Sequence, residues 1–90
     1  MLSHLDRQKA HRAVEHLQRL RAANLRRLRE RFPTVLAFSL AIAKSPSMYH
    51  HLVGNPETGE PPRRNIGERL ARQIEAALHL DLGWLDRKHS

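Results

Sequence analysis

The chain has 90 residues, which is enough for one small domain and too few for two ordinary hydrophobic cores. Sixteen Lys and Arg against nine Asp and Glu give a formal net charge of +7. Cysteine is absent, which excludes disulfide scaffolds, thiolate zinc sites and cysteine nucleophiles. The longest apolar run, residues 35–43, is about half of a membrane span, and no apolar signal-peptide core follows Met1. We therefore expect a cytoplasmic protein with no membrane partner.

The first 32 residues are predicted to be helical, because leucine and alanine dominate the chain and strand-favouring residues are few. Their apolar residues share one broad face, which Arg21 interrupts. Either the helix breaks near residues 18–22, or one long helix changes its packing partner there. We accordingly expect a helical extension over residues 1–18 and the main domain over residues 19–90.

Two short helices are predicted in the middle of the chain, with a very tight turn between them. Thr34 can cap a helix that runs to about Ala43, and its predicted inward-facing residues are Val35, Leu36, Phe38 and Ile42. Ser45 can cap the next helix, with Pro46 at its first position and Gly54 at its end. So short a connection prevents antiparallel packing, and the two helices should cross steeply as in a helix-turn-helix.

A long loop over residues 54–65, rich in proline and glycine, leads to the last predicted helix. That helix has apolar residues at helical spacing, namely Leu70, Ala71, Ile74, Ala77 and Leu78. Its cap is either Asn65, in a capping box with Glu68, or Gly67. After it, Gly83 allows a tight bend and Trp84 is expected to fill the core. The predicted fold is all-α, a compact bundle of four to five helices with a central helix-turn-helix and an N-terminal helical extension.

The positive charge is concentrated in the first half of the chain. Residues 1–44 contain ten basic and three acidic side chains, whereas residues 45–90 contain six of each. An arginine-rich helical domain of this kind can bind nucleic acid, an anionic membrane surface or an acidic protein. Arginine favours the first of these, because its planar fork matches phosphate oxygens.

The helix predicted to begin at Ser45 has the features of a DNA-reading element. Ser47 and Met48 follow Pro46, and small or polar groups at a helix N-terminus let the backbone approach a groove. His50 and His51 come one turn later, and histidine can donate to or accept from base edges. In addition, Asn55, Arg63 and Arg64 could hold phosphates beside that groove.

Metal binding and catalysis find no support in the sequence. His4, His11 and His16 lack the spacing that places two ligands on one helix face, and His50 and His51 are adjacent. No serine has a nucleophile elbow or triad context, and the four glycines are scattered rather than forming a phosphate loop. We therefore expect no metal, no cofactor and no enzyme activity.

Three stretches of the chain match one known pattern. They are Asn24–Leu28 (NLRRL), Lys44–Ser47 (KSPS), and the closing segment NIGERLARQIE from Asn65 with GWLD at Gly83–Asp86. On these residues the chain from about Asn24 to Asp86 resembles the lambda-repressor-like helix-turn-helix domains of phage repressors and related bacterial regulators. The sequence departs from that pattern at three positions. Ser39 replaces a small alanine, Ala43 replaces the glycine of the turn, and Tyr49 replaces an aliphatic residue.

The resemblance implies that residues 46–53 form a recognition helix in the major groove. The implied base-contacting residues are Ser47, Met48, His50 and His51, with Pro46 and Met48 against thymine methyl groups. The implied phosphate-contacting residues are Thr34, Lys44, Ser45, Asn55, Arg63 and Arg64. It also implies that Ala43 takes a left-handed conformation, at a cost of about 1 kcal/mol.

The predicted function is sequence-specific binding of double-stranded DNA by a transcriptional repressor that acts as a homodimer on a palindromic operator. Residues 3–17 would either form the dimer through Leu5, Val14 and Leu17 or extend the basic surface. One alternative is an antitoxin or another protein-interaction module with the same fold, whose extension grips a partner. The other alternative is an amphipathic basic helix that binds membranes.

Overall fold

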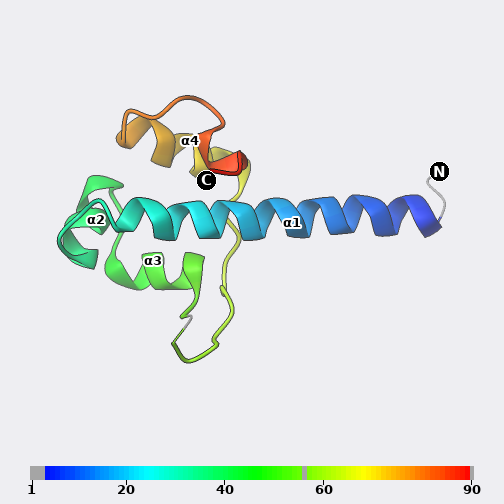
Figure 1. Ribbon diagram of the computed structural model, residues 1–90, viewed down its shortest axis with the longest axis horizontal. Helices are drawn as coiled ribbons and strands as arrows, with labels where there is room; N and C mark the ends of the chain where they lie inside the picture. The colour runs from blue at the N-terminus through cyan, green and yellow to red at the C-terminus, as the bar shows by residue number, and fades with distance from the viewer. Residues whose placement is uncertain (1–3, 56, 90) are drawn as a thin grey trace.

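The computed structural model describes residues 4–55 and 57–89, with side chains from residue 13 onward. In chain order its elements are α1 (His4–Arg29), α2 (Val35–Ala41), α3 (Pro46–Val53), α4 (Glu68–Ala77) and the 3-10 turn η1 (Trp84–Asp86). Within these ranges the only extended pairing is an isolated bridge between Asn55 and Glu60. The all-α bundle is thereby confirmed (Figure 1). No helix in the described part of the chain is long and apolar enough to cross a membrane.

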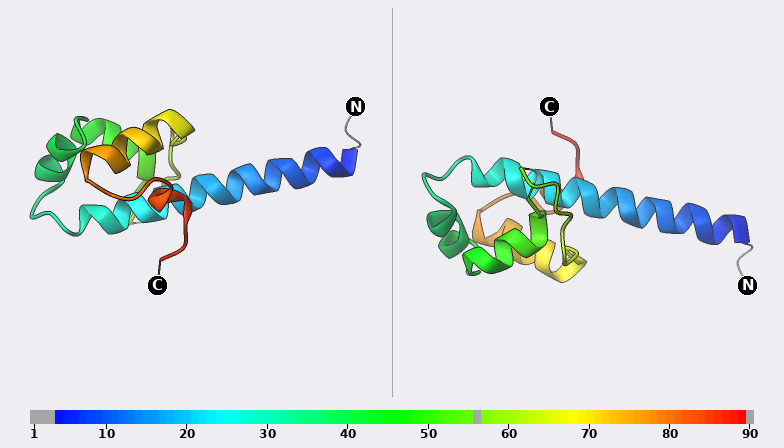
Figure 2. Two further views of the ribbon diagram at one scale, coloured as in Figure 1. Left: turned by 90° about the horizontal axis from the view of Figure 1, so that it is seen from above. Right: turned by 90° about the horizontal axis from the view of Figure 1, so that it is seen from below.

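α1 runs without a break through residues 18–22, so the alternative of a broken helix is wrong and that of one long helix is correct. Its C-terminal half packs against α3 and η1. Its N-terminal half projects away from the other helices, as all three views show (Figures 1 and 2). The division of the chain at residue 18 stays a prediction, because the helix itself contains no boundary there.

α2 and α3 are capped by the residues that the sequence predicts. The Thr34 hydroxyl accepts the N–H of Ala37 at 3.0 Å, and the Ser45 hydroxyl accepts the N–H of Met48 at 3.1 Å. α2 ends at Ala41, two residues before the predicted end, because Ala43 is left-handed with a φ of 58°. A Cβ in that region costs about 1 kcal/mol. α2 lies across the end of the molecule while α3 runs beside α1 (Figure 1), which is the expected helix-turn-helix arrangement.

The core lies between the C-terminal half of α1 and the shorter elements. Its fully buried side chains include Leu25, Phe38, Leu52, Ile74 and Leu85. The Phe38 ring meets the edge of the Tyr49 ring at 5.5 Å, so the aromatic residue that departs from the family pattern fills the centre of the core.

Two expectations about the core are wrong, and a third, for Trp84, is only partly right. Leu36 is 56% exposed, because α2 is short and turns only Phe38, Ser39 and the following Ile42 inward. Ala77 at the end of α4 is also exposed. Trp84 is only partly buried and stacks on His89 at 3.8 Å between ring centroids, while its neighbour Leu85 fills the core.

Arg21 interrupts the apolar face of α1 because it is a buried ion-pair centre, only 3% exposed. Its Nε and Nη2 donate to the two carboxylate oxygens of Asp86 at 2.6 and 3.0 Å. Nη2 also reaches Glu68 at 2.9 Å, and Nη1 donates to the carbonyl of Ile66 at 2.8 Å. One side chain therefore joins α1 to the start of α4 and to η1.

Two further buried polar side chains hold the C-terminal turn. The Glu75 carboxylate accepts the N–H groups of Gly83 and Leu85 at 2.9 and 2.8 Å, and Gly83 adopts the predicted bend with a φ of 88°. The Asn24 amide donates to the carbonyls of Leu85 and Arg87 at 2.8 and 2.7 Å. At the other end of α4 the cap is Gly67, so the capping box at Asn65 is wrong and the alternative is correct.

The Arg21–Asp86 pair predicts a specific acid sensitivity. The Arg21 guanidinium, helped by Arg72 at 2.6 Å, holds the pKa of Asp86 below its ordinary value. A carboxyl whose pKa is lower in the folded state stabilises the fold above the unfolded-state pKa of about 4. That stabilisation is lost as the pH falls through the folded-state pKa.

We expect Asp86→Asn to lower the free energy of unfolding at pH 7 by about 3 kcal/mol, because Arg21 stays buried with one partner fewer. The variant should also lose part of the stability decrease that the parent protein shows below about pH 4. Urea denaturation at pH 7 and at acid pH measures both effects. Asp81→Asn, which removes an exposed carboxylate nearby, is the control. Equal acid sensitivity in parent and Asp86→Asn would contradict this explanation.

Candidate nucleic-acid interface

α3 presents one side to the core and the other to solvent. Tyr49, Leu52 and Val53 are buried. Ser47 and His50 are exposed, and Met48 and His51 are half-buried. Ser47, His50 and His51 therefore lie away from the core face of α3, whereas Met48 packs in part against the core. The projecting half of α1 does not cover α3 (Figure 1).

The loop after α3 brings two arginines back to that helix. The carbonyl of His51 accepts the N–H groups of both Arg63 and Arg64, at 2.8 and 3.0 Å. The Arg64 guanidinium also lies 3.6 Å from the sulfur of Met48. Both arginines are exposed. Backbone hydrogen bonds therefore hold two cations beside α3 and leave their charged ends exposed to solvent.

This return of the loop requires Gly54. Its φ is 71°, and a Cβ there would overlap the carbonyl oxygen of Glu60 and lie 2.8 Å from backbone atoms of Pro61 and Pro62. The next residue, Asn55, donates its N–H to the same Glu60 carbonyl at 2.9 Å. Only glycine permits both the left-handed conformation and the close approach.

Five of the predicted contact residues surround one surface hollow of about 340 Å³, and they are Ser47, His50, His51, Asn55 and Arg63. Glu60 lies on the same hollow, 3.9 Å from the Arg63 guanidinium, and both side chains of this pair are largely exposed. Such an exposed pair is weak and can exchange its partner for a phosphate at little cost. The hollow is therefore polar, with α3 as its wall.

The other predicted phosphate contacts are placed differently. Thr34 and Ser45 are exposed but use their hydroxyls as helix caps, and Lys44 is half-buried in the turn. Asn55 holds its own loop, since its side-chain oxygen accepts the N–H of Glu57 at 3.0 Å. The structure does not place Thr34, Lys44 and Ser45 on the hollow that contains Arg63.

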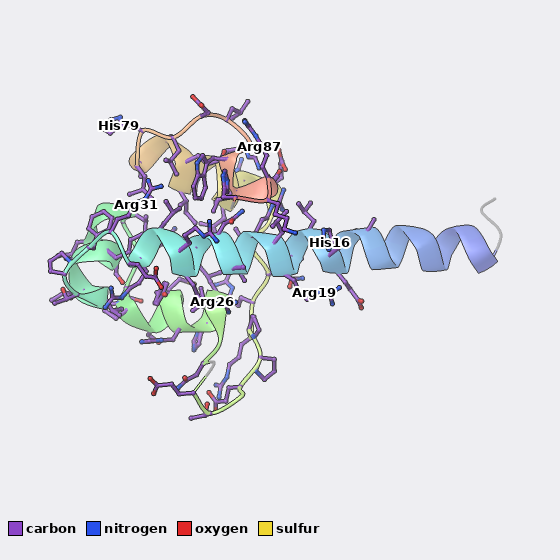
Figure 3. The ribbon with its side chains drawn as sticks, viewed as in Figure 1. His16, Arg19, Arg26, Arg31, His79 and Arg87 are labelled. Atoms are coloured by element: carbon purple, nitrogen blue, oxygen red, sulfur yellow. The ribbon has the colours of Figure 1, made fainter. Side chains whose placement is uncertain are left out.

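Arg26 and Arg29 were not among the predicted contact residues, yet they lie on the opposite flank of α3. They line a second hollow of about 530 Å³ together with Tyr49 and His50. Arg26 donates to the carbonyl of Val53 at 3.0 Å and thereby caps α3 (Figure 3). Burial raises the pKa of Tyr49, and the positive charges of Arg29 and Arg26 partly oppose that rise. The spacing of three between the two arginines places them on one side of α1, a signal that the sequence contained.

The exposed side of α3 is therefore flanked by cations from two segments that are distant in sequence. Arg63 and Arg64 lie on one flank, and Arg26 and Arg29 lie on the other. Glu30, Glu57 and Glu60 reduce the local charge without removing it. A helix between two rows of guanidinium groups suits a polyanion with regularly spaced phosphates. In the part of the chain that the structure describes, no cluster of side chains has the composition of a metal site.

The sequence of the chain is similar to that of a known repressor protein. It is 33% identical over 70 residues to the prophage repressor CohE of Escherichia coli (strain K12). Those residues are 78% of this chain and 29% of that repressor, so the chain spans less than a third of its relative's length. No protein-family model and no solved structure matches the chain. The similarity to a prophage repressor agrees with the resemblance inferred from the sequence.

The close contact between Gly54 and the loop backbone predicts that a larger residue at position 54 would displace Arg63 and Arg64. We expect Gly54→Ala to lower the free energy of unfolding by about 2 kcal/mol, because it adds backbone strain and displaces the loop. The amide protons of Arg63 and Arg64 should lose protection from hydrogen exchange as their bonds to His51 break. Gly59→Ala is the control, since Gly59 also has a positive φ but open space around it. Unchanged protection in Gly54→Ala would contradict this role.

Proposed function

We propose that the chain is the DNA-binding part of a transcriptional repressor, and that it reads the major groove of double-stranded DNA with α3. The observation that carries the proposal is the exposed side of α3 between two pairs of arginines. The similarity to a prophage repressor supports the same function and favours it over the antitoxin and membrane-binding alternatives. In this proposal the protein acts by occupying DNA and performs no catalysis.

The proposed base contacts come from the exposed side of α3. Ser47 and His50 have the most accessible side chains, and Met48 and His51 lie beside them. Hydroxyl and imidazole groups can donate to or accept from base edges, and the thioether of Met48 suits a thymine methyl group. Each good contact of this kind discriminates against a wrong base by about 1–3 kcal/mol.

The proposed phosphate contacts come from both flanks of α3. Arg63 and Arg64 are the main contacts on the loop side, where Asn55 holds the loop. Thr34, Lys44 and Ser45 add contacts near the turn between α2 and α3. Arg26 and Arg29 extend the proposal to the other flank. These contacts set the position of the protein on the duplex and carry no sequence information.

We also propose that the protein is a homodimer formed through the projecting half of α1. Val14 there is 55% exposed and Leu17 is half-buried, at a spacing of three that places them on one face. Leu5, which sequence analysis assigns to the same contact, lies outside the residues with described side chains. Sedimentation velocity should give a dimer for the parent chain and a monomer for Val14→Asp, because a carboxylate would be buried in the contact. A dimer in both would place the interface elsewhere.

Variants of base-contacting and of phosphate-contacting residues should differ in their effects, and this difference tests the proposed function directly. His51→Ala should weaken binding to the preferred duplex about tenfold and leave binding to random duplex unchanged. The double variant Arg63→Gln, Arg64→Gln should weaken both and reduce the slope of log affinity against log salt by about 2. Fluorescence anisotropy over a salt series measures affinity and slope together. Equal losses on both duplexes for His51→Ala would remove its role in base reading.

A further inference from the structure

A third hollow, of about 510 Å³, lies between α1 and the loop that follows α3. Its α1 side includes Val14, Gln18 and Arg19, and its loop side includes Pro61, Pro62 and Arg64. Arg64 belongs to the proposed phosphate-binding surface and touches Met48 of α3. The hollow therefore connects that surface to the part of α1 where the helix leaves the body of the protein.

Arg19, like the exposed Arg27, differs from Arg21, Arg26 and Arg29 on the inner part of α1. The guanidinium groups of Arg21, Arg26 and Arg29 donate to Asp86 or to backbone carbonyls within the protein. Arg19 is exposed and makes no hydrogen bond or ion pair with any residue whose side chain the structure describes. A guanidinium group with all its donors free is available to an external anion.

Arg19 also faces the proposed DNA side of the molecule. Figure 3 shows Arg19 and Arg26 on the side of α1 where α3 and the loop lie, whereas Arg31 and Arg87 lie on the side of α4. Glu15 lines the same hollow, so the local field is not uniformly positive. Gln18 uses its side-chain oxygen to accept the N–H of Ile66 at 2.9 Å, which ties α1 to the end of the loop. The hollow is consequently a fixed feature with Arg19 at one rim and Arg64 at the other.

We propose that Arg19 binds a backbone phosphate of the duplex outside the base pairs that α3 reads. This inference rests on the proposed function. Each strand of DNA presents one phosphate per about 3.4 Å of helix axis, so a duplex seated on Arg64 supplies further anions towards α1. One continuous polyanion can occupy both rims, which an isolated carboxylate cannot do. The long first helix thereby widens the contact surface beyond the helix-turn-helix.

The test compares Arg19→Gln with Arg87→Gln, which removes the same charge on the far side of α1. Arg19→Gln should weaken binding about three- to tenfold, to preferred and random duplex alike, and reduce the salt slope by about 0.9. Ethylation interference should reveal at least one phosphate at the edge of the site whose modification weakens the parent protein and not Arg19→Gln. The unfolding midpoint should not change, because Arg19 holds no described partner.

Two results would overturn the inference. In the first, the parent protein binds duplex, but the slope of log affinity against log salt is the same for Arg19→Gln and Arg87→Gln. The ethylation interference pattern of Arg19→Gln is then also the same as that of the parent protein. That outcome leaves the proposed function intact and removes only the contact at Arg19. The second is an absence of duplex binding by the parent protein, which removes the proposed function and this extension together.

Discussion

Burial of the Arg21 guanidinium is the constraint on which the arrangement of the helices depends. A buried charge without partners would be strongly destabilising, so its site must place Asp86, Glu68 and the carbonyl of Ile66 around it. Those three groups belong to η1, to α4 and to the end of the loop after α3. A single requirement on one side chain therefore selects one packing of α1 against the C-terminal third of the chain.

The burial of Arg21 also fixes the position of the loop that carries Arg63 and Arg64. Arg21 and Gln18 hold the carbonyl and the N–H of Ile66, which fixes the far end of the loop. Gly54 permits the close return at the near end. Between these two anchors the arginines of the loop are bound to the carbonyl of His51, so they need little reordering to meet phosphates. Preorganisation of this kind reduces the entropy lost on binding.

Features governed by a few neighbouring residues were predictable from the sequence. The hydroxyls of Thr34 and Ser45 predict two helix starts, and the very short connection predicts the tight turn. The left-handed Ala43 in that turn followed from the family resemblance. Features that depend on distant segments were not predictable in the same way. Glu75 on α4 is buried only because it accepts two backbone N–H groups of the C-terminal turn. Likewise, the spacing of Arg26 and Arg29 places them on one side of α1, but they flank α3 only because α1 packs beside it.

The central claim is that the exposed side of α3 recognises a particular duplex sequence. Selection of bound fragments from a random duplex library by the parent chain tests it most directly. We expect enrichment of a short preferred sequence, present as two inverted half-sites if the protein is a dimer. This preference should disappear when Ser47, His50 and His51 are replaced together by alanine, while salt-sensitive binding to duplex persists. A bound pool that remains random in sequence would contradict the claim.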